Sequence, residues 1–192
     1  MPEPTLRSHI AKFITLSDAE AESIELFFTR RTVKKKVLLL EEGKKCNELY
    51  FVLDGCMRMF YLEEKGTEQT IQFAIENWWM TDLSSFYGDR SAEFSIQTIE
   101  ETRLMCVDKI ALEKLLTAHP KMERYFSIIY QKAYAASLLR VKYIFGMSKE
   151  SFYNHFSSLY PEFLQRVPQY ILASFLGLTP EYLSELRRKK LH

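Results

Sequence analysis

The spacing of hydrophobic positions divides the chain into helical and strand-like stretches. Residues 6–29 carry apolar side chains at helical intervals, and Ser17 with Glu20 forms an S-x-x-E capping box that predicts a helix at about 18–28. From Val33 to Val107 apolar and polar positions alternate and turn residues recur, which indicates short antiparallel strands. After this stretch the helical spacing returns. The pattern therefore predicts an α+β fold.

The strand region is predicted to close on itself. Gly43, Gly55 and Gly66 interrupt it at points where a positive φ or a bulge would suit a curling sheet. Closure would also remove exposed sheet edges. We therefore expect an N-terminal β jelly-roll domain.

A long helix is predicted for residues 120–145, which would span about 39 Å at about 1.5 Å per residue. Alternate spacings of four and three give it a heptad stripe that only Arg140 interrupts. The stripe consists of Met122, Phe126, Ile129, Ala133, Ala136 and Tyr143. Packing on the barrel accounts for part of this stripe, but other faces of the helix are apolar as well. We therefore expect the helix to cover the barrel and to meet a second copy in a parallel homodimer.

The last thirty residues carry the most specific motif. With Gln169 as the first position of a helix-turn-helix, Ala173 falls at the fifth position and Gly177 at the ninth. A small fifth residue lets the two helices cross closely, and glycine at the ninth takes a left-handed turn. Thr179 is predicted to cap the second helix, with Pro180 at its first position. The remaining core positions are all leucines: Leu172, Leu176, Leu178, Leu183 and Leu186. A helical hairpin that contacts another protein is the alternative interpretation.

The charge of the C-terminal segment supports DNA binding, whereas the net charge of the whole chain does not. The whole chain has 26 Lys and Arg against 25 Asp and Glu, a net charge of +1, so no overall field attracts nucleic acid. Residues 163–192 are locally basic, and we expect Arg187, Arg188 and Lys189 to bind phosphates. Glu181 is a candidate acceptor for cytosine N4, and Glu185 is expected to pair with Lys189 or to set selectivity. The expected base-reading face consists of Thr179, Pro180, Glu181, Tyr182, Ser184 and Glu185.

Composition excludes several other classes of protein. Hydrophobic residues make up 47% and charged residues 27%, with only 6 Gly and 6 Pro, which is typical of a folded globular chain. The three cysteines have no metal-binding spacing and are interpreted as buried thiols in a reducing compartment. No signal peptide and no membrane span is recognisable, so we expect a cytoplasmic protein.

These motifs together resemble the cyclic-AMP receptor protein and Fnr (Crp/Fnr) family of dimeric bacterial transcription regulators. The resemblance covers nearly the whole chain through the segments EEGKKCNELYFVLDGCMRMFYL, ENWWMTDLSSF, HPKMERYF and QRVPQYILASFLGLTPEYLSELRRK. It implies a cyclic-nucleotide-binding-like sensor domain at 1–118, a dimerisation helix and hinge at 119–146, and a helix-turn-helix DNA-binding domain at 147–192. The implied partners are double-stranded DNA, a second copy of the chain and, for an activator, RNA polymerase.

The same resemblance locates an effector pocket and shows where this chain departs from the family. In nucleotide-binding members a glutamate holds the ribose hydroxyl, and an Arg-Ser pair holds the cyclic phosphate. Here Asp82 is at the glutamate position and Ala92-Glu93 aligns with the Arg-Ser pair. We therefore expect a degenerate pocket without tight cyclic-AMP binding, and a shifted Arg90 in place of the arginine is the alternative. The pocket residues are Asp82, Leu83, Ser84, Arg90, Ala92 and Glu93.

Three other interpretations remain at this stage. The protein could be a true cyclic-nucleotide-responsive regulator, or a ligand-binding or protein-interaction module that does not bind DNA. A jelly roll also hosts cupin enzymes, but their metal needs histidines inside the barrel, and all four histidines lie outside the strand region. We therefore expect no enzyme, no metal and no cofactor, and an effector of unknown identity. Because the sequence ends at His192, directly after the second helix, we also expect no strand hairpin there to add phosphate contacts.

Overall fold

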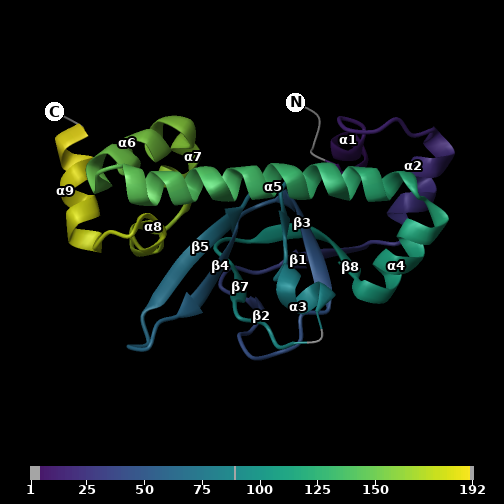
Figure 1. The fold of residues 1–192 in the computed structure, drawn as a ribbon, viewed down its shortest axis with the longest axis horizontal. Helices are drawn as coiled ribbons and strands as arrows, with labels where there is room; N and C mark the ends of the chain where they lie inside the picture. Colours follow the sequence, from purple (N-terminus) through teal and green to yellow (C-terminus); the bar gives the residue numbers. More distant parts are fainter. Residues whose placement is uncertain (1–4, 89, 191–192) are drawn as a thin grey trace. The chain divides into compact units, whose positions relative to one another are not determined.

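The computed structural model describes residues 5–88 and 90–190, and it confirms the α+β fold (Figure 1). Contacts within the chain define two compact units. The first comprises the residues up to Met59 together with Phe73–Gln131, and the second comprises Phe60–Gln72 together with the residues from Lys132 onwards.

Two short helices begin the first unit: α1 (Leu6–Ile10) and α2 (Asp18–Glu25). The predicted capping box is present at α2, where the Ser17 side chain accepts from the backbone N–H of Glu20 and the Glu20 carboxylate accepts from the backbone N–H of Ser17. The helix ends at Glu25, three residues before the predicted end at 28. The box satisfies two N–H groups that the first helical turn would otherwise leave without a partner.

Eight strands in the described residues form two four-stranded sheets, as expected for a jelly roll. The strand order is β1-β8-β3-β6 in one sheet and β2-β7-β4-β5 in the other. The strands are β1 (Thr29–Val33), β2 (Leu38–Leu40), β3 (Glu48–Asp54), β4 (Met57–Leu62), β5 (Glu68–Ala74), β6 (Trp79–Met80), β7 (Ser95–Thr98) and β8 (Thr102–Asp108). Strands β3 and β8 pair antiparallel, with Leu49 opposite Val107 and Val52 opposite Leu104. All four of these side chains are buried, which makes this strand pair the centre of its sheet.

A buried aromatic cluster joins the N-terminal helix to the start of the long helix α5 (Lys121–Gly146). The Tyr125 hydroxyl accepts a hydrogen bond from Trp79 Nε1 at 2.8 Å and lies 2.7 Å from His9 Nδ1. The Phe51 ring packs against both the His9 and Trp79 rings. Burial raises the pKa of Tyr125. Helix α4 (Lys109–Ala118) precedes α5, and Asp108 caps it through the N–H of Ala111.

The tight connection between β3 and β4 depends on a glycine. Gly55 has φ +103, and a Cβ atom there would lie 2.7 Å from the carbonyl oxygen of Glu101 and from Cα of Thr102. We expect Gly55→Ala to lower the free energy of unfolding by about 3 kcal/mol, because it adds a backbone clash to an unfavourable φ. Urea denaturation followed by circular dichroism would measure the loss.

Gly66 supplies the matched control for this variant. It also has a positive φ, of +77, but a Cβ atom there would meet nothing within 4 Å. Gly66→Ala should therefore cost only about 1 kcal/mol, the conformational penalty alone. Equal losses of unfolding free energy in the two variants would show that the close approach of the backbone at Gly55 does not add to the cost of the substitution.

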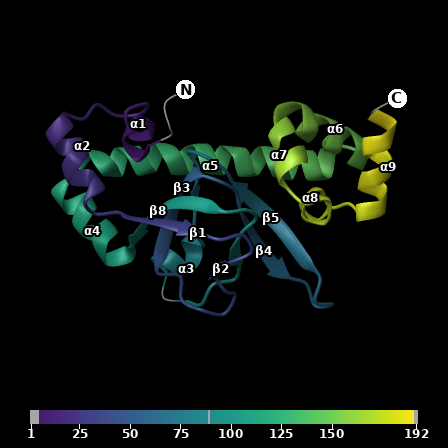
Figure 2. The same ribbon diagram turned by 180° about the vertical axis from the view of Figure 1, so that it is seen from behind.

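The second unit gathers four helices around the C-terminal part of α5 (Figure 2). They are α6 (Lys149–Leu159), α7 (Pro161–Arg166), α8 (Gln169–Leu176) and α9 (Pro180–Lys190). Ser148 caps α6 by accepting from the N–H of Ser151. The core of the second unit consists of the buried side chains of Phe156, Phe163, Leu172 and Leu183. Within the described residues, none of the helices is both long enough and apolar enough to cross a lipid bilayer.

Candidate DNA-binding and effector sites

Helices α8 and α9 form the predicted helix-turn-helix. Gly177 has φ +66, the left-handed conformation expected at the ninth position, and the N–H of Leu178 bonds to the carbonyl of Ala173 at 2.9 Å. Ala173 is fully buried, as a close crossing of two helices requires. The leucines at the core positions are buried as well: Leu172, Leu176, Leu178, Leu183 and Leu186.

Side-chain hydrogen bonds fix the first turn of α9. The Thr179 hydroxyl accepts from the N–H of Tyr182 at 3.2 Å, which is the expected cap. The side-chain amide of Gln169, at the start of α8, donates to the carbonyl of Pro180 at 2.9 Å. The N-terminal turn of the second helix is thus held from both sides before any DNA is present.

The predicted base-reading residues differ in exposure. Thr179, Pro180, Glu181 and Ser184 are exposed, whereas Tyr182 and Glu185 are half-buried. The exposed positions lie on the side of α9 opposite its buried leucines. The structure therefore presents a short polar face in the first turns of α9, and its contact with bases stays a prediction.

The basic residues at the end of α9 have different partners. Lys189 Nζ lies 3.0 Å from Glu185 Oε1, the pair expected from their spacing, and the hydrogen bond to Glu185 raises the pKa of Lys189. Arg187 donates to the carbonyl of Leu164 at 3.4 Å and is half-buried. Arg188 is exposed. Arg187 thus holds α9 against α7, whereas Arg188 and Lys189 are exposed, and their contact with phosphates stays a prediction.

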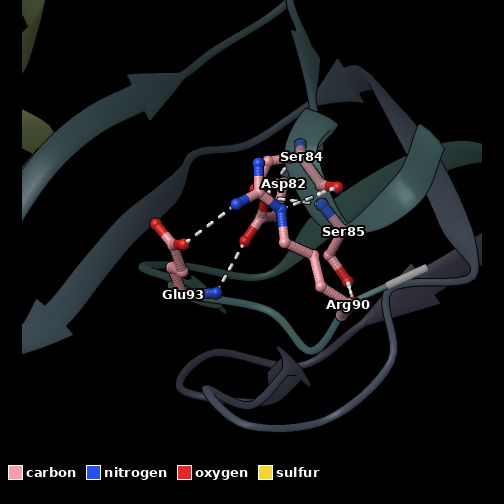
Figure 3. A network of polar contacts seen from close by, with 5 residues as sticks. All are labelled: Asp82, Ser84, Ser85, Arg90 and Glu93. Atoms are coloured by element: carbon pink, nitrogen blue, oxygen red, sulfur yellow. Dashed lines mark hydrogen bonds and ion pairs between the residues drawn. The ribbon is translucent and has the colours of Figure 1, made fainter. Parts of the chain in front are cut away.

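Asp82 is the centre of the polar network at the expected effector pocket (Figure 3). Its carboxylate caps the short helix α3 (Leu83–Tyr87): Oδ1 accepts from the N–H groups of Ser84 and Ser85, each at 3.1 Å, and from the Ser84 hydroxyl at 3.0 Å. Oδ2 accepts from the N–H of Glu93 at 2.9 Å. The Asp82 side chain is only 3% exposed. The hydrogen-bond donors of this loop are therefore satisfied by a buried carboxylate of the protein itself.

The other expected pocket residues are arranged around this carboxylate. Arg90 forms an ion pair with Glu93 at 3.5 Å, and both side chains are more than half exposed (Figure 3). Leu83 is 44% exposed, and Ala92 is buried with its N–H bonded to the carbonyl of Lys44. Asp82, Ser84, Arg90 and Glu93 thus form one network that neither Leu83 nor Ala92 joins through its side chain.

Ser85 belongs to the same network and was missed from the sequence. Its hydroxyl donates to the carbonyl of Arg90 at 2.8 Å and accepts from the N–H of Cys46 at 3.1 Å. Its position in the first turn after a capping aspartate is the signal that could have identified it. No group of three or more His, Cys, Asp and Glu side chains that could hold a metal ion occurs among residues 5–88 and 90–190.

Several residues of the expected dimer stripe pack inside their own chain. Met122 and Phe126 are 0% and 4% exposed and belong to the core of the first unit. Ile129 is half-buried, whereas Ala133 and Ala136 are exposed. The centroid of the Tyr143 ring lies 4.6 Å from that of the His155 ring and 6.3 Å from that of the Phe152 ring, so Tyr143 packs on α6.

A different face of α5 exposes large apolar side chains. Tyr134, Leu138, Val141 and Phe145 are 66%, 52%, 50% and 86% exposed, at spacings of four, three and four residues. With about 3.6 residues per helical turn, this stripe lies on a different face from Arg140 and Tyr143, which contact the C-terminal helices. We call these four residues the exposed stripe. An apolar heptad stripe of this kind is typical of helices that pair.

Comparisons with known proteins agree with this architecture. Residues 30–119 match the family of the cyclic nucleotide-binding domain. The c-di-GMP responsive global regulator CLP of Xanthomonas campestris is 17% identical, with 91% of this chain and 92% of that chain covered and a TM-score of 0.72. FixK2 of Bradyrhizobium japonicum is 16% identical, with 84% and 83% covered and a TM-score of 0.70.

The catabolite activator protein of Thermus thermophilus is 18% identical, with 92% of this chain and 84% of that chain covered and a TM-score of 0.57. The comparison with curated protein sequences finds no match. Residues 30–119 therefore resemble a cyclic nucleotide-binding domain, and the chain has the fold of the Crp/Fnr transcription regulators CLP, FixK2 and catabolite activator protein.

Proposed function

We propose that this protein is a cytoplasmic, homodimeric transcription regulator that binds a pseudo-palindromic DNA operator without requiring a cyclic nucleotide. The observation that carries the proposal is the helix-turn-helix of α8 and α9, with its left-handed turn at Gly177, its buried leucine core and its exposed polar first turn. This arrangement inserts the N-terminal turns of a second helix into the major groove of duplex DNA.

The exposed residues of α9 have the chemistry to read bases and bind phosphates. The Glu181 carboxylate can accept from the N4 amino group of cytosine, the Ser184 hydroxyl can bond to several bases, and Pro180 can touch a thymine methyl group. Arg188 and Lys189 supply phosphate contacts that carry no sequence information. The ion pair with Lys189 partly compensates the charge of Glu185, which reduces its repulsion of the DNA backbone.

The exposed stripe of α5 supports a dimer through this helix. Pairing two copies along Tyr134, Leu138, Val141 and Phe145 buries side chains that the single chain leaves open to water. A two-fold dimer presents two α9 helices, and successive major grooves on one side of the duplex lie about 34 Å apart. The operator of such a dimer has inverted half-sites at that separation.

The Asp82 network supports independence from cyclic nucleotides. A cyclic phosphate bound at this loop would compete with the Asp82 carboxylate for the N–H groups of Ser84, Ser85 and Glu93, which already bond to it. The exposed carboxylate of Glu93 would repel a phosphate, and Arg90 is already paired with it. Binding an anion here would therefore break existing bonds and bring like charges together.

The cyclic-nucleotide part of the proposal predicts a null result in calorimetry. Titration with cyclic AMP, cyclic GMP or cyclic di-GMP, the last chosen because CLP responds to it, should give no saturable heat up to about 1 mM ligand. A dissociation constant in the micromolar range for any of the three would contradict this part, and that ligand would then be the effector.

In-vitro selection tests the DNA-binding part. Random duplexes are incubated with the purified protein at physiological salt, without ligand, and the bound fraction is sequenced. We expect a site with two inverted half-sites, and the selection repeated with Glu181→Gln should change the preferred base at one position in each half-site. No enrichment, with or without cyclic nucleotides, would favour a protein-interaction module instead.

A further inference from the structure

The C-terminal end of α8 is held by donors from outside the helix-turn-helix. The last carbonyl groups of a helix have no partner within it and must be satisfied elsewhere. Here Arg140 of α5 donates from Nη2 to the carbonyl of Phe175 at 2.9 Å, and the side-chain amide of Gln69 donates to the carbonyl of Ser174. Both contacts lie within the second unit of the chain.

The Arg140 guanidinium makes a second contact with the same residue. Its central carbon lies 4.3 Å from the centroid of the Phe175 ring, and Phe175 is only 9% exposed. Among the described residues no carboxylate pairs with Arg140, and its Nε is buried without a hydrogen-bond partner. Burial therefore lowers the pKa of this guanidinium.

An apolar residue would pack at this position without the cost of burying a charge. A cation at a helix C-terminus interacts favourably with the helix dipole. The planar guanidinium can also stack on a ring while it donates in its own plane, which a lysine cannot do. The arrangement of Arg140 thus serves the orientation of α8 rather than burial alone.

Ser174 provides an independent tie at the same end of α8. Its hydroxyl accepts from the N–H of Thr70 at 2.7 Å and donates to the carbonyl of Glu68 at 2.9 Å. Three groups of the β4–β5 hairpin, from Glu68, Gln69 and Thr70, therefore bond to one residue of α8. The first helix of the motif cannot rotate without breaking contacts on both sides.

We propose that Arg140 is a positioning residue that fixes the helix-turn-helix on α5 and thereby sets the half-site spacing that the dimer accepts. This inference rests on the proposed function, because spacing has meaning only for a dimer that binds a palindrome. Arg140 bonds to α8, the first helix of the motif. It acts through Phe175 and α8, so its loss loosens the angle between the dimerisation helix and α9 while α9 itself stays folded.

Binding to operators of altered spacing tests the proposal. Arg140→Gln and Arg140→Lys are compared with Lys142→Gln, which removes a cation from an exposed position two residues away on the same helix. On the selected operator we expect Arg140→Gln to bind roughly tenfold more weakly, from the loss of one charged hydrogen bond. The preference of wild type for that spacing over sites one base pair longer or shorter should fall by a similar factor.

Two further readouts separate positioning from other roles. The slope of log affinity against log salt should be unchanged in Arg140→Gln, since no phosphate contact is lost. Arg140→Lys should behave like Arg140→Gln, because lysine cannot both stack on Phe175 and reach its carbonyl. Lys142→Gln should keep the wild-type spacing preference.

Hydrogen exchange of the DNA-free protein tests whether Arg140 holds α8, independently of DNA binding. Amides from Ala173 to Leu178, at the end of α8 and in the turn that follows, should exchange at least several-fold faster in Arg140→Gln than in wild type or Lys142→Gln. If wild type selects no DNA, the proposed function fails, while the exchange rates still show whether Arg140 holds α8. Unchanged exchange, or an equal loss of affinity at every spacing, would overturn the inference.

Discussion

Leu138→Glu combined with Val141→Glu should convert the proposed dimer to a monomer in sedimentation velocity experiments at micromolar concentration. Both side chains are about half exposed in the single chain, so the substitutions remove few contacts within it. In a paired helix they would place four carboxylates in an apolar seam, at a cost that dimer formation cannot offset. Affinity for a palindromic site should fall about 100-fold or more, because each half-site is then bound alone.

Lys142→Glu is the control for this variant. It adds a carboxylate to the same exposed part of α5 but off the exposed stripe, so the protein should stay dimeric. Circular dichroism of the double variant should show unchanged helix content, as expected if the monomer stays folded. A double variant that remains dimeric would move the interface to another surface, such as the exposed small residues Ala133 and Ala136 of the stripe expected from the sequence.

Asp82→Ala should lower the free energy of unfolding by about 3 kcal/mol, one of the largest losses available outside the apolar core. The carboxylate is 3% exposed and accepts from three backbone N–H groups and one hydroxyl. Alanine would leave the N–H groups of Ser84, Ser85 and Glu93 without this acceptor. Urea denaturation monitored by tryptophan fluorescence would measure the change.

Two variants show which part of the network matters. Glu93→Ala removes the exposed ion pair with Arg90 but keeps the backbone N–H that bonds to Asp82, so it should cost less than about 0.5 kcal/mol. Asp82→Asn keeps one acceptor oxygen and should fall between the two. A loss in Asp82→Ala as small as that in Glu93→Ala would show that water replaces the carboxylate and that the loop is open to ligands.

Local signals in the sequence predicted the helix-turn-helix well. Gly177, Thr179 and Pro180 act within a few residues of themselves, through a left-handed turn, a cap and a fixed φ, so their effect is readable without the fold. The same holds for the capping box of Ser17 and Glu20. The C-terminal end of α2 was predicted less accurately, because no comparable local signal marks where this helix ends.

Long-range contacts decided which polar groups satisfy one another. Asp82 and Glu93 are eleven residues apart, and nothing between them indicates that a backbone N–H would meet that carboxylate. Arg140 and Phe175 are 35 residues apart, and the sequence shows Arg140 only as an interruption of an apolar stripe. These partners are chosen by how separate elements pack, which local spacing does not encode.

The sequence by itself determined the order of elements, the alternation that builds two sheets, and the motif that turns α8 into α9. Each of these follows from periods and turn residues whose physics is local. Only the tertiary structure decided which face of α5 stays exposed. The sequence of a helix that is apolar on several sides does not show which side meets its neighbours. Met122 and Phe126 are buried and Tyr143 packs on α6, whereas Leu138 and Val141 stay exposed.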